Sequence, residues 1–214
     1  MLFVWGNNTN GQLGIGNLVH RSSPVQVTTL SNEALTLSYA TYIGSSTPYY
    51  SWSQVSAGTG GVLAIRNDGM LFAWGPNTTG QLGLNSTVGN SSPTPVGTSS
   101  WTQVAMTMGT AGTFTTASAY AIRSDGALFA WGLNSTGQLG LSDFVHRSSP
   151  VQIGTSSWTS VSSKESYALA IRTDGALFGW GYNLYAQLGD NTLGDKNSPV
   201  QIGTSSWSSV SAGT

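Results

Sequence analysis

Short stretches in which apolar and polar residues alternate run along the chain, and turns containing glycine separate them. The clearest example is residues 166–172, where apolar and small residues recur at about every second position, followed by the apolar segment 176–180. Thr173-Asp174-Gly175 lies between the two segments, and glycine supplies the positive φ that tight hairpin turns need. The pattern predicts an antiparallel hairpin. Residues 158–162 predict a strand before it, and residues 150–153 predict a short outer strand that begins with a proline.

This arrangement of strands and turns recurs along the chain as a set of phrases in fixed order. The phrases are an Asp-Gly turn, found before three of the four copies, a Leu-Phe-x-Trp-Gly strand, a Gly-Gln-Leu-Gly loop with one variant, a Ser-Pro pair and a second tryptophan. The tryptophans of the Leu-Phe-x-Trp-Gly strand are Trp5, Trp74, Trp131 and Trp180, and those of the second column are Trp52, Trp101, Trp158 and Trp207. The turn glycines are Gly69, Gly126 and Gly175. We expect these residues to be structural, with the indoles packed between neighbouring units.

Four short strands in a unit of about 50 residues are typical of a β-propeller blade. The sequence therefore predicts an all-β fold, with blades of four antiparallel strands. We expect a single repeat domain over residues 1–214 and about four blades. The predicted units are 1–51 (partial, with an insertion at 28–51), 52–100, 101–157 (with an insertion at 109–119), 158–206 and the start of a further unit at 207–214.

One unit departs from the Gly-Gln-Leu-Gly loop. Ala186 stands where the other copies have Gly11, Gly80 and Gly137. Glycine adopts backbone conformations that are unfavourable for other residues. We therefore expect a slightly different local geometry at Ala186.

The phrases resemble the repeat of the regulator of chromosome condensation family. The match in one unit includes Asp125-Gly126, Trp131-Gly132, Asn134, residues 137–140 and Pro150, and the neighbouring units repeat it. The resemblance covers nearly the whole chain outside the two insertions and implies a β-propeller. Members of the family usually close a ring of seven blades, so we interpret the chain as a segment of a larger propeller. The alternative is that four blades close alone or pair with another copy.

The composition narrows the classes of function. Only 7% of residues are charged, and the formal net charge is -1. A protein that binds nucleic acid through phosphate neutralisation needs a basic surface, so we expect no nucleic-acid partner. No apolar stretch is long enough for a membrane helix, so we expect no membrane insertion. The chain has no cysteine, which excludes disulfides and thiolate chemistry.

Repeat position also explains the residues that could suggest catalysis. Asp68, Asp125 and Asp174 lie in the predicted turns, and an arginine two residues before each is expected to hold a neighbouring loop or blade. His20 and His146 share one column, which predicts loop residues on separate blades rather than a metal site. No nucleophile elbow, phosphate-binding loop or zinc motif is present. We predict no enzymatic activity, no catalytic or metal-binding residue and no cofactor.

The insertions are the predicted binding regions, because function on a rigid repeat scaffold is carried by its variable loops. The first insertion contains Tyr39, Tyr42, Tyr49 and Tyr50. Tyrosine gives a large amphipathic contact area at low entropic cost. These side chains predict a binding surface, with the alternative that they pack the loop onto its blade or onto a neighbouring chain.

Together these features predict a non-enzymatic structural or interaction scaffold. The low charge and the abundance of Ser, Thr, Asn and Gly suggest a virion-associated, cell-surface or secreted propeller that contacts proteins or glycans. The alternative is a cytoplasmic signalling module that resembles the guanine-nucleotide exchange or enzyme-inhibitor members of the family. Further copies of the chain, or further blades, are also expected partners.

Overall fold

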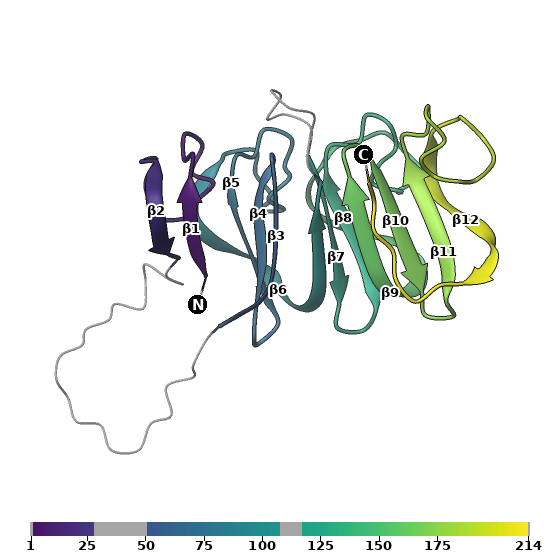
Figure 1. Cartoon of the computed structure of the whole chain (residues 1–214), viewed down its shortest axis with the longest axis horizontal. Coiled ribbons are helices and arrows are strands. Elements are labelled where there is room, and N and C mark those ends of the chain that lie inside the picture. The colour runs from purple at the N-terminus through teal and green to yellow at the C-terminus, as the bar shows by residue number, and fades with distance from the viewer. Residues whose placement is uncertain (1, 28–50, 108–116, 214) are drawn as a thin grey trace, which may run out of the picture.

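The computed structural model describes residues 2–27, 51–107 and 117–213, and all regular secondary structure in these ranges is β-strand (Figure 1). The strands are β1 (Phe3–Gly6), β2 (Arg21–Gln26), β3 (Trp52–Gly58), β4 (Gly61–Arg66), β5 (Met70–Gly75), β6 (Asn90–Met106), β7 (Ser118–Arg123), β8 (Ala127–Gly132), β9 (Arg147–Lys164), β10 (Tyr167–Arg172), β11 (Ala176–Gly181) and β12 (Lys196–Ser206). Each pairs antiparallel with its neighbours. The predicted all-β, antiparallel fold is confirmed. Within the same ranges, no helix has the length and apolar character needed to cross a membrane.

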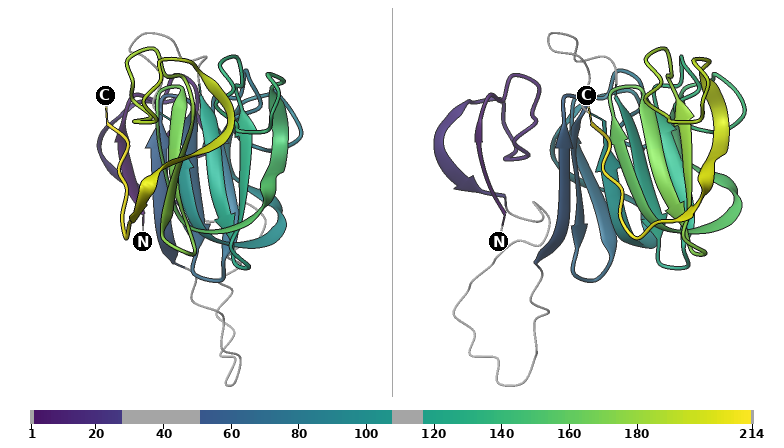
Figure 2. Two further views of the ribbon diagram at one scale, coloured as in Figure 1. Left: turned by 90° about the vertical axis from the view of Figure 1, so that its right-hand side faces the viewer. Right: turned by 45° about the vertical axis from the view of Figure 1, so that its right-hand side comes forward.

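The strands form blades that follow one another along the chain. Blade 1 contains β1 and β2, and blade 2 contains β3, β4, β5 and the first part of β6. Blade 3 contains the rest of β6, with β7, β8 and the first part of β9. Blade 4 contains the rest of β9, with β10, β11 and β12. Figure 2 shows the blades side by side, with β1 and β2 at one end of the stack and β12 at the other.

Strands β6 and β9 are longer than the sequence pattern indicates, and β9 shows why. Residues 150–153 and 158–162 were predicted as separate strands, but both lie in β9, which crosses from blade 3 to blade 4. Ser157 pairs with β8, whereas Trp158 pairs with β10. Gly154 has a φ of +56°, and a register shift in the β8–β9 ladder lies close to it. The strand thus bends between two sheets at an irregularity around Gly154.

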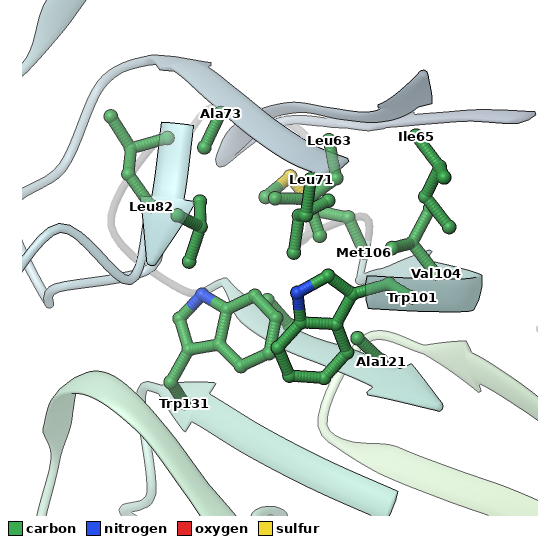
Figure 3. Packing of buried hydrophobic residues seen from close by; sticks show 12 residues of the cluster. Leu63, Ile65, Leu71, Ala73, Leu82, Trp101, Val104, Met106, Ala121 and Trp131 are labelled. Atoms are coloured by element: carbon green, nitrogen blue, oxygen red, sulfur yellow. The ribbon is translucent and has the colours of Figure 1, made fainter. Parts of the chain in front are cut away.

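The hydrophobic core lies between the blades. Leu63, Ile65 and Leu71 of blade 2 pack against Trp101 and Trp131 of blade 3 (Figure 3). A second cluster joins blades 3 and 4 in the same way and includes Trp158 and Trp180. Within a blade, the tryptophan of the first strand meets the phenylalanine of the third edge-on, with ring centroids 5.2 Å apart for Trp101 and Phe129.

The position of each tryptophan in the stack determines its burial. Trp74, Trp131 and Trp180 are fully buried, and Trp101 and Trp158 are nearly so. Trp5 and Trp207, at the two ends, are 61% and 45% exposed. The expectation that all eight indoles pack between units does not hold for these two, because no described blade lies against the outer side of either.

The turn glycines and the insertions complete the comparison with the sequence. Gly69, Gly126 and Gly175 have φ values of +87°, +87° and +86°, the left-handed conformation that the hairpin turns require. Tyr39, Tyr42, Tyr49 and Tyr50 lie outside the described residues, as does most of the predicted insertion 109–119. The end of that insertion differs from the prediction, because Ser118 already belongs to β7.

Candidate protein-interaction surface

Each blade carries one long loop between its last two strands. These loops span residues 7–20, 76–89, 133–146 and 182–195. Because β1, β5, β8 and β11 occupy the same place in successive blades, all four loops lie on the same side of the row of blades, along the upper edge in Figure 1.

A buried asparagine holds each loop in shape. In blade 3, the Leu139 N–H donates to Asn134 Oδ1 at 2.9 Å, and Asn134 Nδ2 donates to the carbonyls of Asp143 and Val145 at 3.0 and 3.3 Å. The equivalent residues are Asn8, Asn77 and Asn183, which make corresponding bonds. All four are at most 1% exposed. One amide thus fixes both the start and the tip of the loop.

The next blade clamps the same loop from the side. The Trp131 Nε1–H donates to the Gln81 carbonyl at 2.9 Å, and the Trp180 Nε1–H donates to the Gln138 carbonyl at 2.8 Å. Trp74 bonds the Gln12 carbonyl in the same way, at 3.0 Å. The loops therefore present their tips from a rigid base.

The tips of the loops expose apolar side chains in equivalent positions. These side chains, which we call the apolar loop row, are Leu18, Val19, Val88, Phe144, Val145 and Leu193, and they are 56–74% exposed. Each loop contributes at least one of them. Leu184 and Tyr185 add 55% and 79% exposed side chains to the fourth loop. Exposed apolar groups that lie on one side of a rigid scaffold are typical of a protein-binding surface.

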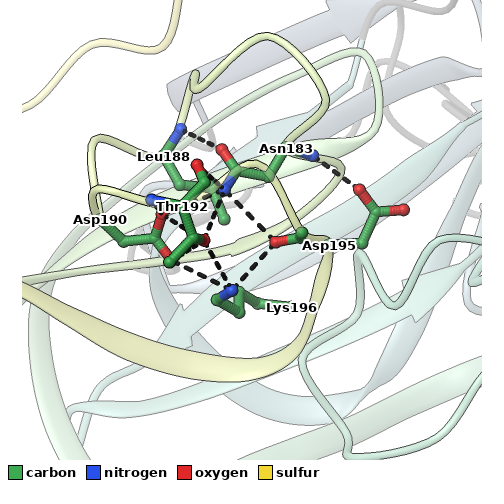
Figure 4. Close-up of polar contacts among 7 residues, drawn as sticks. Asn183, Leu188, Asp190, Thr192, Asp195 and Lys196 are labelled. Carbon is green, nitrogen blue, oxygen red and sulfur yellow. Dashed lines mark hydrogen bonds and ion pairs between the residues drawn. The ribbon is translucent and has the colours of Figure 1, made fainter.

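The fourth loop replaces part of this framework with charged groups (Figure 4). Asp190 accepts hydrogen bonds from Thr192 and Asn183, and its carboxylate lies 3.2 Å from Lys196 Nζ. Burial raises the pKa of Asp190, but the hydrogen bonds from Thr192, Lys196 and Asn183 outweigh it and lower the pKa to about 2. Asp190 is thus ionised over the physiological pH range and serves to hold the loop.

The two histidines cap their own loops. His20 Nδ1 accepts a hydrogen bond from the Asn8 N–H at 2.8 Å, and His146 Nδ1 accepts one from the Asn134 N–H at 3.0 Å. In the fourth loop, Asp195 takes this role at 2.8 Å. Their shared column is therefore explained by capping. Within the described ranges, no three His, Asp or Glu residues are placed to hold a metal ion.

The Asp-Gly turns lie on the opposite side of the row of blades from these loops. Arg123 forms an ion pair with Asp125 at 2.7 Å, and its guanidinium lies 4.9 Å from the centroid of the Phe129 ring. Arg172 and Asp174 repeat this geometry. Hydrogen bonds from the arginine lower the pKa of each aspartate to about 2. These arginines bind within their own hairpin, whereas the sequence analysis expected them to hold a neighbouring loop or blade.

The apolar loop row is not among the predicted binding regions, which lie in the insertions. The signal was present in the repeat alignment, since a valine stands in one loop column of three units at Val19, Val88 and Val145. This column lies outside the Gly-Gln-Leu-Gly phrase, among Ser, Asn, Asp and Thr residues, so its apolar character was a signal of an exposed apolar position.

The comparisons with known proteins agree with the repeat architecture. The model of the "Regulator of chromosome condensation (RCC1) repeat" matches residues 1–65, 68–114, 125–171 and 174–214. The human probable E3 ubiquitin-protein ligase HERC6 is 33% identical over 142 residues, which are 66% of this chain and 12% of that protein. The ultraviolet-B receptor UVR8 of Arabidopsis thaliana is 27% identical over 175 residues, 65% of this chain and 39% of that one. The chain thus spans well under half the length of these relatives.

The solved structures show the same fold at low sequence identity. Prp20p from Saccharomyces cerevisiae has a TM-score of 0.73 at 21% identity, covering 98% of this chain and 49% of that one. Human WBSCR16 has a TM-score of 0.71 at 22% identity, covering 94% and 48%. In both comparisons this chain covers about half of the other chain, as expected for part of a propeller. Since the family model matches most of the sequence, the chain belongs to the regulator of chromosome condensation (RCC1) repeat family.

Proposed function

We propose that this chain is a non-enzymatic protein-interaction module that binds its partner through the apolar loop row. The observation that carries the proposal is the exposure of Phe144, Val145 and their equivalents at the tips of consecutive, rigidly held loops. Burying such side chains against a partner is favourable by about 25 cal/mol per Å² of apolar surface. Because the loops are held in place by the buried asparagines, little conformational entropy is lost on binding.

The charges near the row support a partner surface that is apolar rather than strongly charged. Arg147 pairs with Asp143, and Lys196 pairs with Asp190, so that in both cases the first residue of a strand pairs with an aspartate of the loop before it. A partner with an apolar strip would therefore meet side chains that it can bury without breaking ion pairs. A glycan partner is favoured by no described feature, and Tyr39, Tyr42, Tyr49 and Tyr50, on which that expectation rests, remain a prediction.

The relatives favour the signalling alternative over a virion or cell-surface role. They include a probable E3 ubiquitin-protein ligase, an ultraviolet-B receptor and yeast RCC1 (Prp20), which has been crystallised with Kap60. We propose that this chain, like the propeller part of such proteins, acts by contacting other proteins inside the cell. The ligase activity belongs to the whole HERC proteins, of which this chain matches 8–12%, so it is not part of the proposal.

A site-specific crosslinking experiment tests the proposal. A photo-crosslinking amino acid is placed at Val145, in the apolar loop row, and separately at Ser124, in the exposed turn at the opposite end of blade 3. Each variant is irradiated in an extract of the source cells. We expect a discrete adduct from position 145 and none of the same mass from position 124.

A matched variant separates specific binding from surface stickiness. Phe144→Asp lies beside the crosslinking position, and this side chain is 59% exposed, so the fold should be unchanged. We expect the adduct from position 145 to disappear in this variant. An adduct that persists, or one that forms equally from position 124, contradicts the assignment of the loop row as the binding surface.

A further inference from the structure

Two of the four loops end in a histidine whose ring accepts a hydrogen bond from the backbone of the same loop. In blade 3, the Asn134 N–H donates to His146 Nδ1 at 3.0 Å, and in blade 1 the Asn8 N–H donates to His20 Nδ1 at 2.8 Å. A backbone N–H can only donate, so Nδ1 must be the unprotonated nitrogen of each ring. Both histidines are exposed to solvent. Blade 3 has a described blade on each side, so its loop carries the argument.

Protonation of the ring removes this hydrogen bond. Histidine takes up a proton in the mildly acidic range, and both of its ring nitrogens then donate. A protonated His146 would direct its Nδ1–H at the Asn134 N–H, so that two donors face each other. The ring must therefore turn away, and the Asn134 N–H loses its partner.

Each of these histidines directly follows the exposed apolar side chains of its loop. Phe144 and Val145 precede His146, just as Leu18 and Val19 precede His20. In blade 3, the buried asparagine holds two of these consecutive residues, because its Nδ2 donates to the Val145 carbonyl and its N–H donates to the histidine ring. A change at the histidine therefore acts directly on the apolar loop row.

The other two loops have no histidine at this position. In blade 4, Asp195 Oδ1 accepts the Asn183 N–H at 2.8 Å. A carboxylate still accepts hydrogen bonds in the pH range in which histidine takes up its proton. In blade 2, Gly89 stands at this position and offers no side chain. The loops of blades 2 and 4 therefore serve as internal controls for those of blades 1 and 3.

The charged groups around His146 are already paired. Arg147, the next residue, forms an ion pair with Asp143 of the same loop. On the blade 4 side, the first residue of β12 is Lys196, whose charge is paired with an aspartate of its own loop. On the blade 2 side, the loop of residues 76–89 contains no charged or titratable side chain. The charge that changes in the mildly acidic range at this place is therefore that of the histidine.

We propose that His146, with His20 in the equivalent place, makes the apolar loop row sensitive to pH, so that a partner is held at neutral pH and released in mildly acidic surroundings. This inference rests on the proposed function, because release requires that the row is the binding surface. The change in the loop is a property of the chain alone and can be tested without a partner.

Hydrogen exchange of the 214-residue chain tests the change in the loop. Exchange is measured by NMR at about pH 7.5 and about pH 5.5, on either side of the usual range for histidine. Each amide is expressed as a protection factor, which removes the intrinsic pH dependence of exchange. We expect the protection of the Asn134 amide to fall about three- to tenfold at the lower pH, the value of one lost hydrogen bond. The Asn183 amide, which is capped by Asp195, should keep its protection.

Two variants at one residue provide matched controls. His146→Asp reproduces the carboxylate cap of the fourth loop, so the Asn134 amide should be equally protected at both pH values. His146→Ala removes the cap, so the protection should be low at both. The position is exposed, so either substitution should leave the fold unchanged. Equal protection at both pH values in the original chain, or a fall that persists in His146→Asp, would overturn the proposal.

The crosslinking assay connects the change in the loop to the partner. We expect the adduct from position 145 to weaken at the lower pH in the original chain and to keep its yield in a chain that carries both His20→Asp and His146→Asp. An equal loss of adduct in the two chains contradicts the proposed release. If no adduct forms at either pH, the proposed function fails and the release fails with it, whereas the exchange data still decide the change in the loop.

Discussion

The clamp between blades can be tested by adding one methyl group to the glycine beside the indole. Gly140 has a φ of +68°, and a Cβ built on it would lie 2.9 Å from Nε1 and Cδ1 of Trp180. Gly189 occupies the same place in the last blade, with a φ of +69°, but there the nearest atom is Ile202 Cγ2 at 3.8 Å. Gly140→Ala and Gly189→Ala therefore share the backbone strain and differ in the contact with the next blade.

The difference in free energy of unfolding follows from these distances. Both variants lose about 1–2 kcal/mol, because alanine is disfavoured in the left-handed conformation. Gly140→Ala also forces Trp180 to move within a packed core, which costs about 1–3 kcal/mol. The displaced indole then loses its bond to the Gln138 carbonyl, which leaves a buried N–H unsatisfied at about 1–3 kcal/mol. Gly140→Ala should thus be less stable than Gly189→Ala by about 2–6 kcal/mol.

Urea unfolding followed by tryptophan fluorescence measures this difference, since neither variant changes a tryptophan. If Gly140→Ala proves too unstable to fold, Trp180→Phe provides a second route. The smaller ring leaves room for the methyl group, so Gly140→Ala should cost less in the Trp180→Phe background than in the original chain. Equal losses for the two glycine variants, with no coupling to residue 180, would refute the clamp.

Three further expectations concern the loops and the ends of the stack. Asn134→Ala should cost about 1–3 kcal/mol and accelerate hydrogen exchange in residues 134–146 while leaving the loop of blade 2 protected. Trp158→Ala should cost about 3–5 kcal/mol in urea unfolding, and Trp207→Ala much less, because only Trp158 is buried. The pKa of Asp190 is lowered in the folded state to about 2, so its stabilisation is fully present above its ordinary value of 3.8 and is lost as pH falls towards 2. Chemical shifts of the fourth loop should follow that titration and lose it in Asp190→Asn.

The sequence predicts the blades well because their determinants are local. Gly126 and Gly175 must adopt positive φ for the hairpins to close, and the short runs of apolar and small residues in β7 and β10 suit strands that are buried in a sheet. The joining of two predicted strands into β9 depends instead on how neighbouring blades are placed. That information is not contained in the alternation pattern of either segment.

The burial of side chains in the first and last blades also cannot be predicted from the local sequence. Trp5 and Trp74 stand in the same repeat column and share one register with the outer strand, yet one is mostly exposed and the other is buried. Their environments differ only in the strands and blade that lie beside them. A column in an alignment therefore fixes the conformation of a residue, and its neighbours fix the burial.

Ala186 illustrates the limit of inference from residue type. We expected a changed geometry where alanine replaces glycine, but Ala186 has a φ of +59°, close to the +77° of Gly137. Its N–H donates to the Asn183 carbonyl at 3.0 Å, as the Gly137 N–H donates to the Asn134 carbonyl. The hydrogen bonds of the loop outweigh the moderate cost of a left-handed alanine.

The use of charge agrees with the proposal that apolar side chains of the loops make the contact with a partner. Among the described residues, Arg66, Arg123, Arg147, Arg172 and Lys196 form ion pairs with aspartates that lie within six residues of them along the chain. Such pairs fix turns and loop bases, so their charges are largely neutralised before a partner arrives. The loop tips are then free to vary without affecting the fold, because the buried asparagines and indoles hold the loop through its backbone. Stability and the proposed recognition thus depend on different residues of the same loop.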